Sequence, residues 1–91
     1  MGITNATLGA LNAVSPEFSV SDNNFDISVY GTFVGTVSIQ RKYAGEADSE
    51  YRTVEAVTAP AERYGEVAGN WVYRAIMTAY TSGSAKIKFV N

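Results

Sequence analysis

The chain has 91 residues, contains neither cysteine nor histidine, and carries a net charge of −2 from seven basic and nine acidic side chains. These facts exclude disulfides, the usual zinc sites, and enzymes that depend on a histidine base or a cysteine nucleophile. The charges are interspersed along the sequence, so we expect no binding to nucleic acid or to anionic lipid. No apolar run approaches the roughly 20 residues that span a bilayer, and no membrane contact is expected.

Residues 1–17 differ in composition from the rest of the chain. Apolar side chains are scattered there among Asn, Ala, Thr and Gly, and a Ser-Pro pair closes the segment. We expect an N-terminal arm that is either extended or a short helix from about Ala6 to Ala13, with Asn5 as its N-cap. The start lacks the basic and apolar regions of a signal peptide, so synthesis in the cytoplasm is expected. The candidate interaction residues of this arm are its apolar side chains Ile3, Leu8, Leu11 and Val14.

From residue 18 onward the composition is typical of β-strands. Runs rich in Val, Ile, Thr, Tyr and Phe are broken by Gly, Asn, Asp or Pro. Residues 25–30 place apolar side chains on one face and polar side chains on the other, which predicts a half-buried strand. Residues 36–41 alternate in the same way, and the short connection over residues 31–35 predicts that the two strands form a hairpin.

The second half of the sequence contains further strand candidates. After a polar turn, residues 51–59 continue as a strand until Pro60, which has no N–H to give to a ladder. A short piece at residues 65–67 precedes the longest candidate, residues 71–80, and residues 85–90 supply the last strand.

The spacing of these segments predicts the fold class. About six or seven short strands, with turns about every 8 to 12 residues, are typical of an antiparallel β-sandwich. We therefore predict an all-β protein, with the arm over residues 1–17 and an immunoglobulin-like or jelly-roll-like β-sandwich domain over residues 18–91. The residues expected in its core are Phe25, Ile27, Val29, Val37, Ile39, Trp71, Tyr73 and Phe89.

Acidic side chains offer the few candidates for chemistry. A glycosidase needs two carboxylates about 5 to 9.5 Å apart, for which Asp26 and Glu55 are an example. Two turns, residues 21–24 and 46–50, resemble loops that gather oxygen ligands for calcium. Water-exposed strand charges and ordinary polar turns are the favoured interpretation of all these residues. We expect no enzyme activity, no metal and no cofactor.

Aromatic side chains raise two binding hypotheses. Bases and sugars both stack on exposed rings, and Trp71 is the candidate sugar platform. The acidic net charge argues against nucleic acid, and core or subunit contact is the favoured interpretation of Trp71. The basic residues that lie near tyrosines in the sequence are Arg41, Lys42, Arg52, Arg63 and Arg74, and the tyrosines are Tyr43, Tyr51, Tyr64 and Tyr73.

Two runs resemble a known group of proteins. Residues 31–41 read GTFVGTVSIQR and residues 73–83 read YRAIMTAYTSG. They are similar to the G-T-[FW]-V-G-T-V-x-[IL]-Q-R hairpin and the Y-R-x-x-x-x-x-Y-T-S-G strand and turn of small β-sandwich structural proteins of tailed bacteriophages. The resemblance covers roughly residues 25–90, and the turn over residues 44–50 departs from it by having one Gly where the group has Asp-Gly-Gly.

The resemblance implies a function and partners. Such a protein is expected in the virion, on the capsid surface, as a capsid decoration or cement protein. It would bind the major capsid protein on the assembled head and stabilise the shell by bridging capsid subunits. A homo-oligomer is expected, with a trimer as one form. The alternative is a tail, baseplate or fibre-associated module that binds tail proteins or host glycan.

Overall fold

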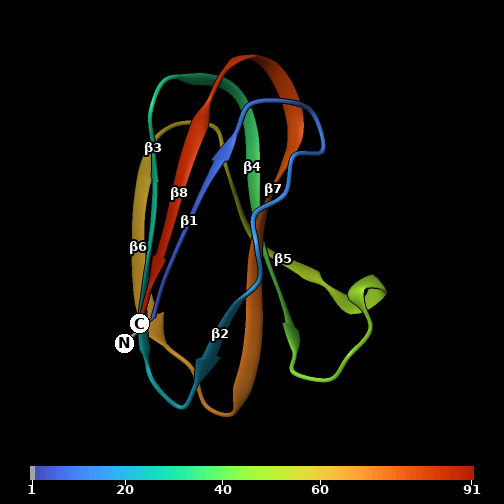
Figure 1. Ribbon diagram of the computed structural model, residues 1–91, viewed down its shortest axis with the longest axis vertical. Coiled ribbons are helices and arrows are strands. Elements are labelled where there is room, and N and C mark those ends of the chain that lie inside the picture. The colour runs from blue at the N-terminus through green and yellow to red at the C-terminus, as the bar shows by residue number, and fades with distance from the viewer. Residues whose placement is uncertain (1) are drawn as a thin grey trace.

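The computed structural model describes residues 2–91, which form eight β-strands and a single 3-10 turn. The strands make two antiparallel four-stranded sheets: sheet A in the order β1-β8-β3-β6 and sheet B in the order β2-β7-β4-β5. Sheet A lies toward the left of Figure 1 and sheet B toward the right, as two facing layers. This arrangement confirms the predicted all-β fold with two antiparallel sheets, which is compatible with a β-sandwich. The elements are β1 (Ile3–Leu8), β2 (Phe18–Ser21), β3 (Asn24–Tyr30), β4 (Phe33–Tyr43), η1 (Asp48–Glu50), β5 (Arg52–Val57), β6 (Ala61–Glu66), β7 (Asn70–Gly83) and β8 (Ala85–Val90).

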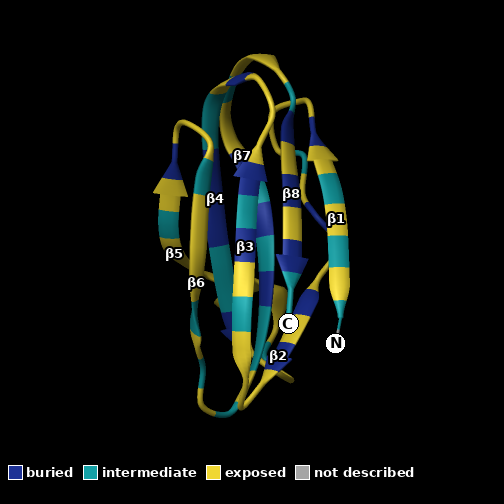
Figure 2. Ribbon diagram, turned by 90° about the vertical axis from the view of Figure 1, so that its left-hand side faces the viewer, coloured by how far each residue is buried: buried dark blue, intermediate teal, exposed yellow. Residues whose placement is uncertain are grey.

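The core lies between the sheets and follows the alternation of the strands. In β8, Ile87 and Phe89 are buried while the lysines between them are exposed, and Figure 2 shows the same banding along β3. The rings of Phe18 and Phe89 stack across the core with centroids 5.2 Å apart. Of the eight predicted core residues, Phe25 and Trp71 are partly buried and pack against the core; the confirmed buried ones are Ile27, Val29, Val37, Ile39, Tyr73 and Phe89.

The predicted hairpin over residues 25–41 is wrong, because its two strands belong to different sheets. β3 lies in sheet A and β4 in sheet B, so the link at Gly31 and Thr32 crosses the sandwich. Alternation could not reveal this, because a strand buries one face whether its partner lies beside it or across the core. Within residues 2–91, β4–β5 is the one connection between consecutive strands that stays in a sheet.

The predicted N-terminal arm is not confirmed, and the short helix from about Ala6 to Ala13 is wrong. β1 pairs with β8 over six residues, from Ile3 opposite Val90 to Leu8 opposite Ala85. The segment looked irregular in sequence because its inward positions are occupied by small side chains and one leucine, and its outward positions are mostly polar. The backbone N–H and C=O groups of this segment need hydrogen-bond partners, and the edge of β8 provides them in place of a helix.

Candidate functional site

The start of the chain supplies the outer strand of both sheets along one side of the sandwich. β1 borders sheet A, and β2 borders sheet B after the preceding residues 12–15 have already paired with β7. Figure 2 shows β1 and β2 on one side of the molecule, with β5 and β6 on the other. We call residues 2–21 the N-terminal edge.

The structure separates the four predicted interaction residues into three exposed side chains and one buried. Ile3, Leu11 and Val14 have 54%, 56% and 48% of their surface exposed, whereas Leu8 has 1% and belongs to the core. Leu8 is therefore unavailable to a partner in this fold. Leu11 and Val14 lie close together in the chain, and Ile3 lies at the opposite end of β1.

Leu11 and Val14 lie on a turn, residues 10–14, that is fastened to β7. The N–H of Ala13 donates to the carbonyl of Ala10 at 3.2 Å, and Asn12 takes a left-handed φ of 66°. The N–H of Asn12 donates to the carbonyl of Met77 at 2.8 Å, and the N–H of Met77 donates to the carbonyl of Ala13 at 2.9 Å. These bonds hold two exposed apolar side chains in place, so a partner that covers them has little backbone left to order.

Lys42 holds the loop between β4 and β5 against sheet B. Its side chain is 10% exposed, and its Nζ donates to Asp48 Oδ1 at 2.8 Å and to the Glu46 carbonyl at 2.9 Å. The hydrogen bond to Asp48 raises the pKa of Lys42, and the same bond lowers the pKa of Asp48. The pKa of Glu46 is lowered first by the N–H of Tyr43 and then by Arg52.

Tyr51 continues this network on the outer face of sheet B. Its hydroxyl donates to Glu17 Oε2 at 2.6 Å, and the Arg74 guanidinium lies over its ring at 3.9 Å. Burial and the bond to Glu17 raise the pKa of Tyr51 far above its usual value. Arg74 also donates to Gln40 Oε1 at 2.9 Å. Most of the basic and aromatic side chains that could have formed a nucleic-acid platform are bound to each other or to acids of the same chain, whereas Tyr64 is 86% exposed.

The acidic turn over residues 46–50 is closed by the protein's own cations. Asp48 pairs with Lys42, and Glu46 pairs with Arg52 at 2.9 Å. No group of three or more His, Cys, Asp or Glu side chains that could hold a metal ion occurs in the part of the chain that the structure describes. The role of Lys42 could not be predicted from the sequence. The alternation of residues along β4 places Lys42 on the outer face, where a lysine is ordinarily exposed to solvent.

These ion pairs predict how stability depends on pH. Because folding lowers the pKa of Asp48 and Glu46, their contribution is present above the unfolded values of about 3.9 and 4.3 and is lost as pH falls through the lower folded values. The raised pKa of Lys42 adds a contribution that is present below 10.5 and is lost as pH rises above that value. Urea unfolding of Asp48→Asn should show a loss relative to wild type at pH 7 that shrinks below about pH 4.

The matched control for that measurement is Glu50→Gln. Glu50 lies in the same η1 turn and forms no ion pair within residues 2–91. Its substitution should leave the pH profile of the wild type unchanged. Identical profiles for Asp48→Asn and Glu50→Gln would mean that the Lys42–Asp48 pair makes no contribution.

Trp71 is not free to serve as a sugar platform. The Arg41 guanidinium lies over its ring at 3.8 Å, and the Tyr43 ring stacks on it with centroids 3.9 Å apart. Two groups that are both within 4 Å of one ring centre must occupy its opposite faces, so both faces of the indole are covered. The indole N–H donates to the carbonyl of Ala68 at 3.0 Å.

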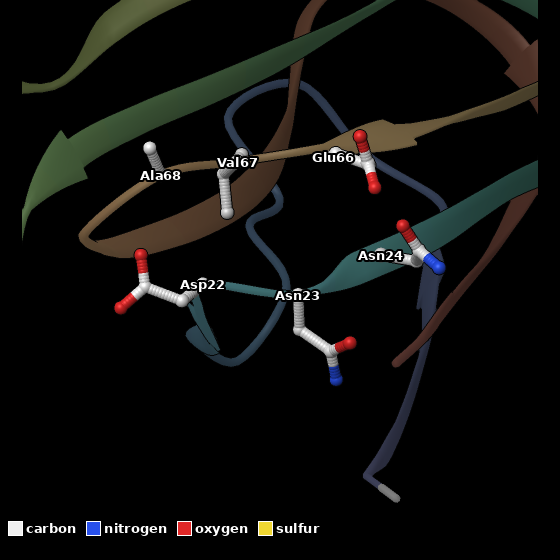
Figure 3. A pocket seen from close by; sticks show the side chains of 6 residues that line it. All are labelled: Asp22, Asn23, Asn24, Glu66, Val67 and Ala68. Atoms are coloured by element: carbon white, nitrogen blue, oxygen red, sulfur yellow. The ribbon is translucent and has the colours of Figure 1, made fainter.

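The polar turn over residues 21–24 lines a shallow depression, but its side chains do not converge. Figure 3 shows Asn24 and Glu66 pointing toward one another, with Asp22 and Asn23 pointing away from them. Asp22 Oδ1 accepts the N–H of Gly69 at 2.6 Å, so its carboxylate ties two turns together. The side chains of the depression therefore stabilise the two turns and do not surround a common point where a ligand could bind.

Asp26 and Glu55, the two carboxylates considered as a catalytic pair, are not brought together by the fold. Asp26 lies on the outer face of sheet A, since its neighbour Ile27 faces the core. Glu55 lies on β5 of the other sheet and pairs with Arg63 at 2.6 Å, which lowers the pKa of Glu55. On this side of the sandwich an ion pair joins β5 to β6, and it borders a small, mostly apolar pocket that Glu55 and Arg63 line and Asp26 does not.

Within residues 2–91, the structure contains no helix that is long and apolar enough to cross a membrane. Comparison with protein-family models, with curated proteins and with solved structures found no match.

Proposed function

We propose that this protein is a virion structural protein that decorates an assembled capsid and attaches through its N-terminal edge. The observation that carries the proposal is the fastened turn at residues 10–14, which exposes Leu11 and Val14 to about half of their surface. Exposed apolar side chains on a rigid support are what a binding surface needs, since their burial gives affinity and the support limits the entropy lost.

The strand order supports a jelly-roll fold as the finer description. Eight strands divide into the orders 1-8-3-6 and 2-7-4-5 among residues 2–91, and nearly every connection crosses between the sheets. In an immunoglobulin domain the last strand joins the sheet of the C and F strands, whereas here β8 lies between β1 and β3. Jelly rolls occur in viral capsid and lectin domains, which is an analogy from fold and not an argument from the site.

A binding role without catalysis is also supported by the side chains. The sequence lacks His and Cys. Of the acids considered for catalysis or metal binding, Glu46, Asp48 and Glu55 are paired with Arg or Lys, and Asp22 accepts a backbone N–H. Asp26 lies on the other sheet from Glu55. In the proposed mechanism, Leu11 and Val14 enter an apolar depression on the major capsid protein. Weak contacts of this kind, repeated over many copies on a closed shell, add up to strong attachment.

The test mixes the purified protein with procapsids and expanded heads of the tailed phage whose structural genes include this chain. We expect stoichiometric, symmetric density on expanded heads by cryo-electron microscopy, with residues 10–14 facing the shell. The proposal would be contradicted if the protein pelleted with neither the procapsids nor the expanded heads.

A double variant, Leu11→Ser with Val14→Ser, tests the contact itself. Because Leu11 and Val14 are only about half exposed, covering each should contribute about half of the 1.5–3 kcal/mol for full burial, and loss of both should weaken attachment at least about tenfold. The control is Val34→Ser, which removes a side chain that is 56% exposed on β4. Unfolding free energies of both variants should lie within about 0.5 kcal/mol of wild type. Equal attachment of the two variants would place the contact elsewhere.

The second candidate is a tail or fibre module that binds host glycan, and one residue favours it. Tyr64 on β6 is 86% exposed, and Asp26 lies opposite it on β3. A flat ring beside a carboxylate can stack on a sugar and accept its hydroxyl hydrogen bonds. Nuclear magnetic resonance titration with oligosaccharides from host lipopolysaccharide should then shift the amide signals around Tyr64, and Tyr64→Ala should abolish the shifts; no shift in wild type would eliminate this candidate.

A further inference from the structure

The four edge strands that border the two sheets within residues 2–91 differ in how they are protected. An unprotected edge presents backbone N–H and C=O groups to any other strand, and proteins block such edges with charges, Pro or bulges. β6 carries Glu62, Arg63 and Glu66, and β5 has charged side chains and a bulge in its pairing with β4. β2 is four residues long and follows Pro16.

β1 has none of these devices. Its sequence ITNATL contains no charge and no proline, and its pairing with β8 runs over six residues without a register shift. Figure 2 shows β1 as the outermost strand on its side, with β2 set further in. The edge of sheet A is therefore open along the whole of β1.

The hydrogen-bond pattern identifies which groups of β1 face outward. Gly2 and Asn91 exchange both backbone hydrogen bonds, at 3.1 and 3.0 Å, so this pair is a hydrogen-bonded one. Because such pairs alternate along an antiparallel ladder, the N–H and C=O groups of every second residue point to β8 and the others point away. The outward groups are those of Ile3, Asn5 and Thr7.

These outward groups are self-complementary about Asn5. We propose that β1 pairs with β1 of a second copy of this chain, antiparallel and around a two-fold axis at Asn5, which joins the two A sheets into one. In this register Asn5 faces Asn5 of the second copy and Ile3 faces its Thr7. Each facing pair consists of outward residues on both strands, so each exchanges two backbone hydrogen bonds.

Charge does not oppose a second copy as the occupant. No charged residue lies on β1, and the cations of β8 on the same face are Lys88, opposite Asn5, and Lys86, opposite Thr7. Three strand spacings would separate the two Lys88 side chains, about 14 Å, which exceeds the screening length of about 8 Å at physiological salt. The interface buries one strand edge, so the dimer is expected to be weak and dependent on concentration.

The inference does not depend on the proposed function, because its test uses the purified protein alone. Sedimentation equilibrium should show reversible dimers as the concentration rises toward about 1 mM. Asn5→Lys and Asn5→Glu place like charges on the axis and should each raise the dissociation constant at least about tenfold. An equimolar mixture of the two variants should recover the association, because position 5 then faces an opposite charge.

A substitution elsewhere and an exchange measurement complete the test. Thr53→Lys adds the same charge on β5 and should associate as wild type does. Hydrogen exchange should slow at the amides of Ile3, Asn5 and Thr7 as the concentration rises. A wild type that stays monomeric at about 1 mM, or an Asn5→Lys variant that associates like wild type, would overturn the proposal. Protection of these three amides on addition of heads, in a protein that is monomeric alone, would overturn it too and assign β1 to the capsid.

Discussion

Leu8→Ala is expected to lower the free energy of unfolding by about 2–5 kcal/mol, the range for deleting a buried leucine from a packed core. Leu8 ends β1, is 1% exposed, and belongs to the buried cluster that includes Phe89 and Ile87. The loss combines the transfer free energy of the removed atoms with the cavity they leave. Urea unfolding at pH 7 measures it directly.

The control for this effect is Leu11→Ala, three residues further along the same segment. Leu11 is 56% exposed on the turn at residues 10–14, so its truncation should change stability by less than about 0.5 kcal/mol. The two leucines would behave alike if residues 1–17 were a separate arm. A small effect of Leu8→Ala would therefore contradict the assignment of β1 to the sandwich.

Gly83→Ala is expected to cost about 2–6 kcal/mol, because strain and a backbone clash act at one position. Gly83 ends β7 with φ at +83°, where a side chain is strained. A Cβ there would also meet the carbonyl oxygen of Thr32 and the Cα of Phe33, neither of which is the movable end of a side chain. The strands β4 and β7 would have to separate at this end.

Gly45→Ala separates the two causes. Gly45 has a similar φ of +89°, but a Cβ there meets nothing within 4 Å. Its substitution should cost about 1–2 kcal/mol, from strain alone. Thermal unfolding of both variants gives the comparison, and equal losses would mean that the close approach of β4 to β7 does not contribute.

Strand character was predictable wherever one face of a strand is buried. Residues 25–30 and 85–90 alternate clearly because their inward side chains are large and apolar, and the structure has β3 and β8 there. β6 has the sequence AERYGE and buries little of its surface, so the sequence predicts only a short strand piece at residues 65–67 there. β1 was missed for the same reason, since most of its inward side chains are small.

The arrangement of strands was not predictable from alternation. A period-two pattern shows which face of a strand is buried. It does not show whether the next strand lies beside it in the same sheet or across the core in the other sheet. This is why residues 25–41 were interpreted as a hairpin although β3 and β4 lie in different sheets. The pairing of β1 with β8 joins the two ends of the described chain, a distance in sequence that local patterns do not encode.

The candidate site was predicted in part. Leu11 and Val14 are exposed, and Ile3 is too, but nothing in the sequence separates them from Leu8, which has the same apolar character. Lys42 looked like an exposed strand lysine, and only the folded loop brings Asp48 to it. Similarly, the covering of Trp71 by Arg41 and Tyr43 depends on the register of β4 against β7.

Amide hydrogen exchange across residues 3–8, measured in dilute solution, tests most directly that the start of the chain is an edge strand of the sandwich. The ladder with β8 predicts an alternating pattern: slow exchange at Thr4, Ala6 and Leu8, whose N–H groups point to β8, and fast exchange at Ile3, Asn5 and Thr7. Uniformly fast exchange over these residues would contradict the structure and favour the N-terminal arm predicted from the sequence.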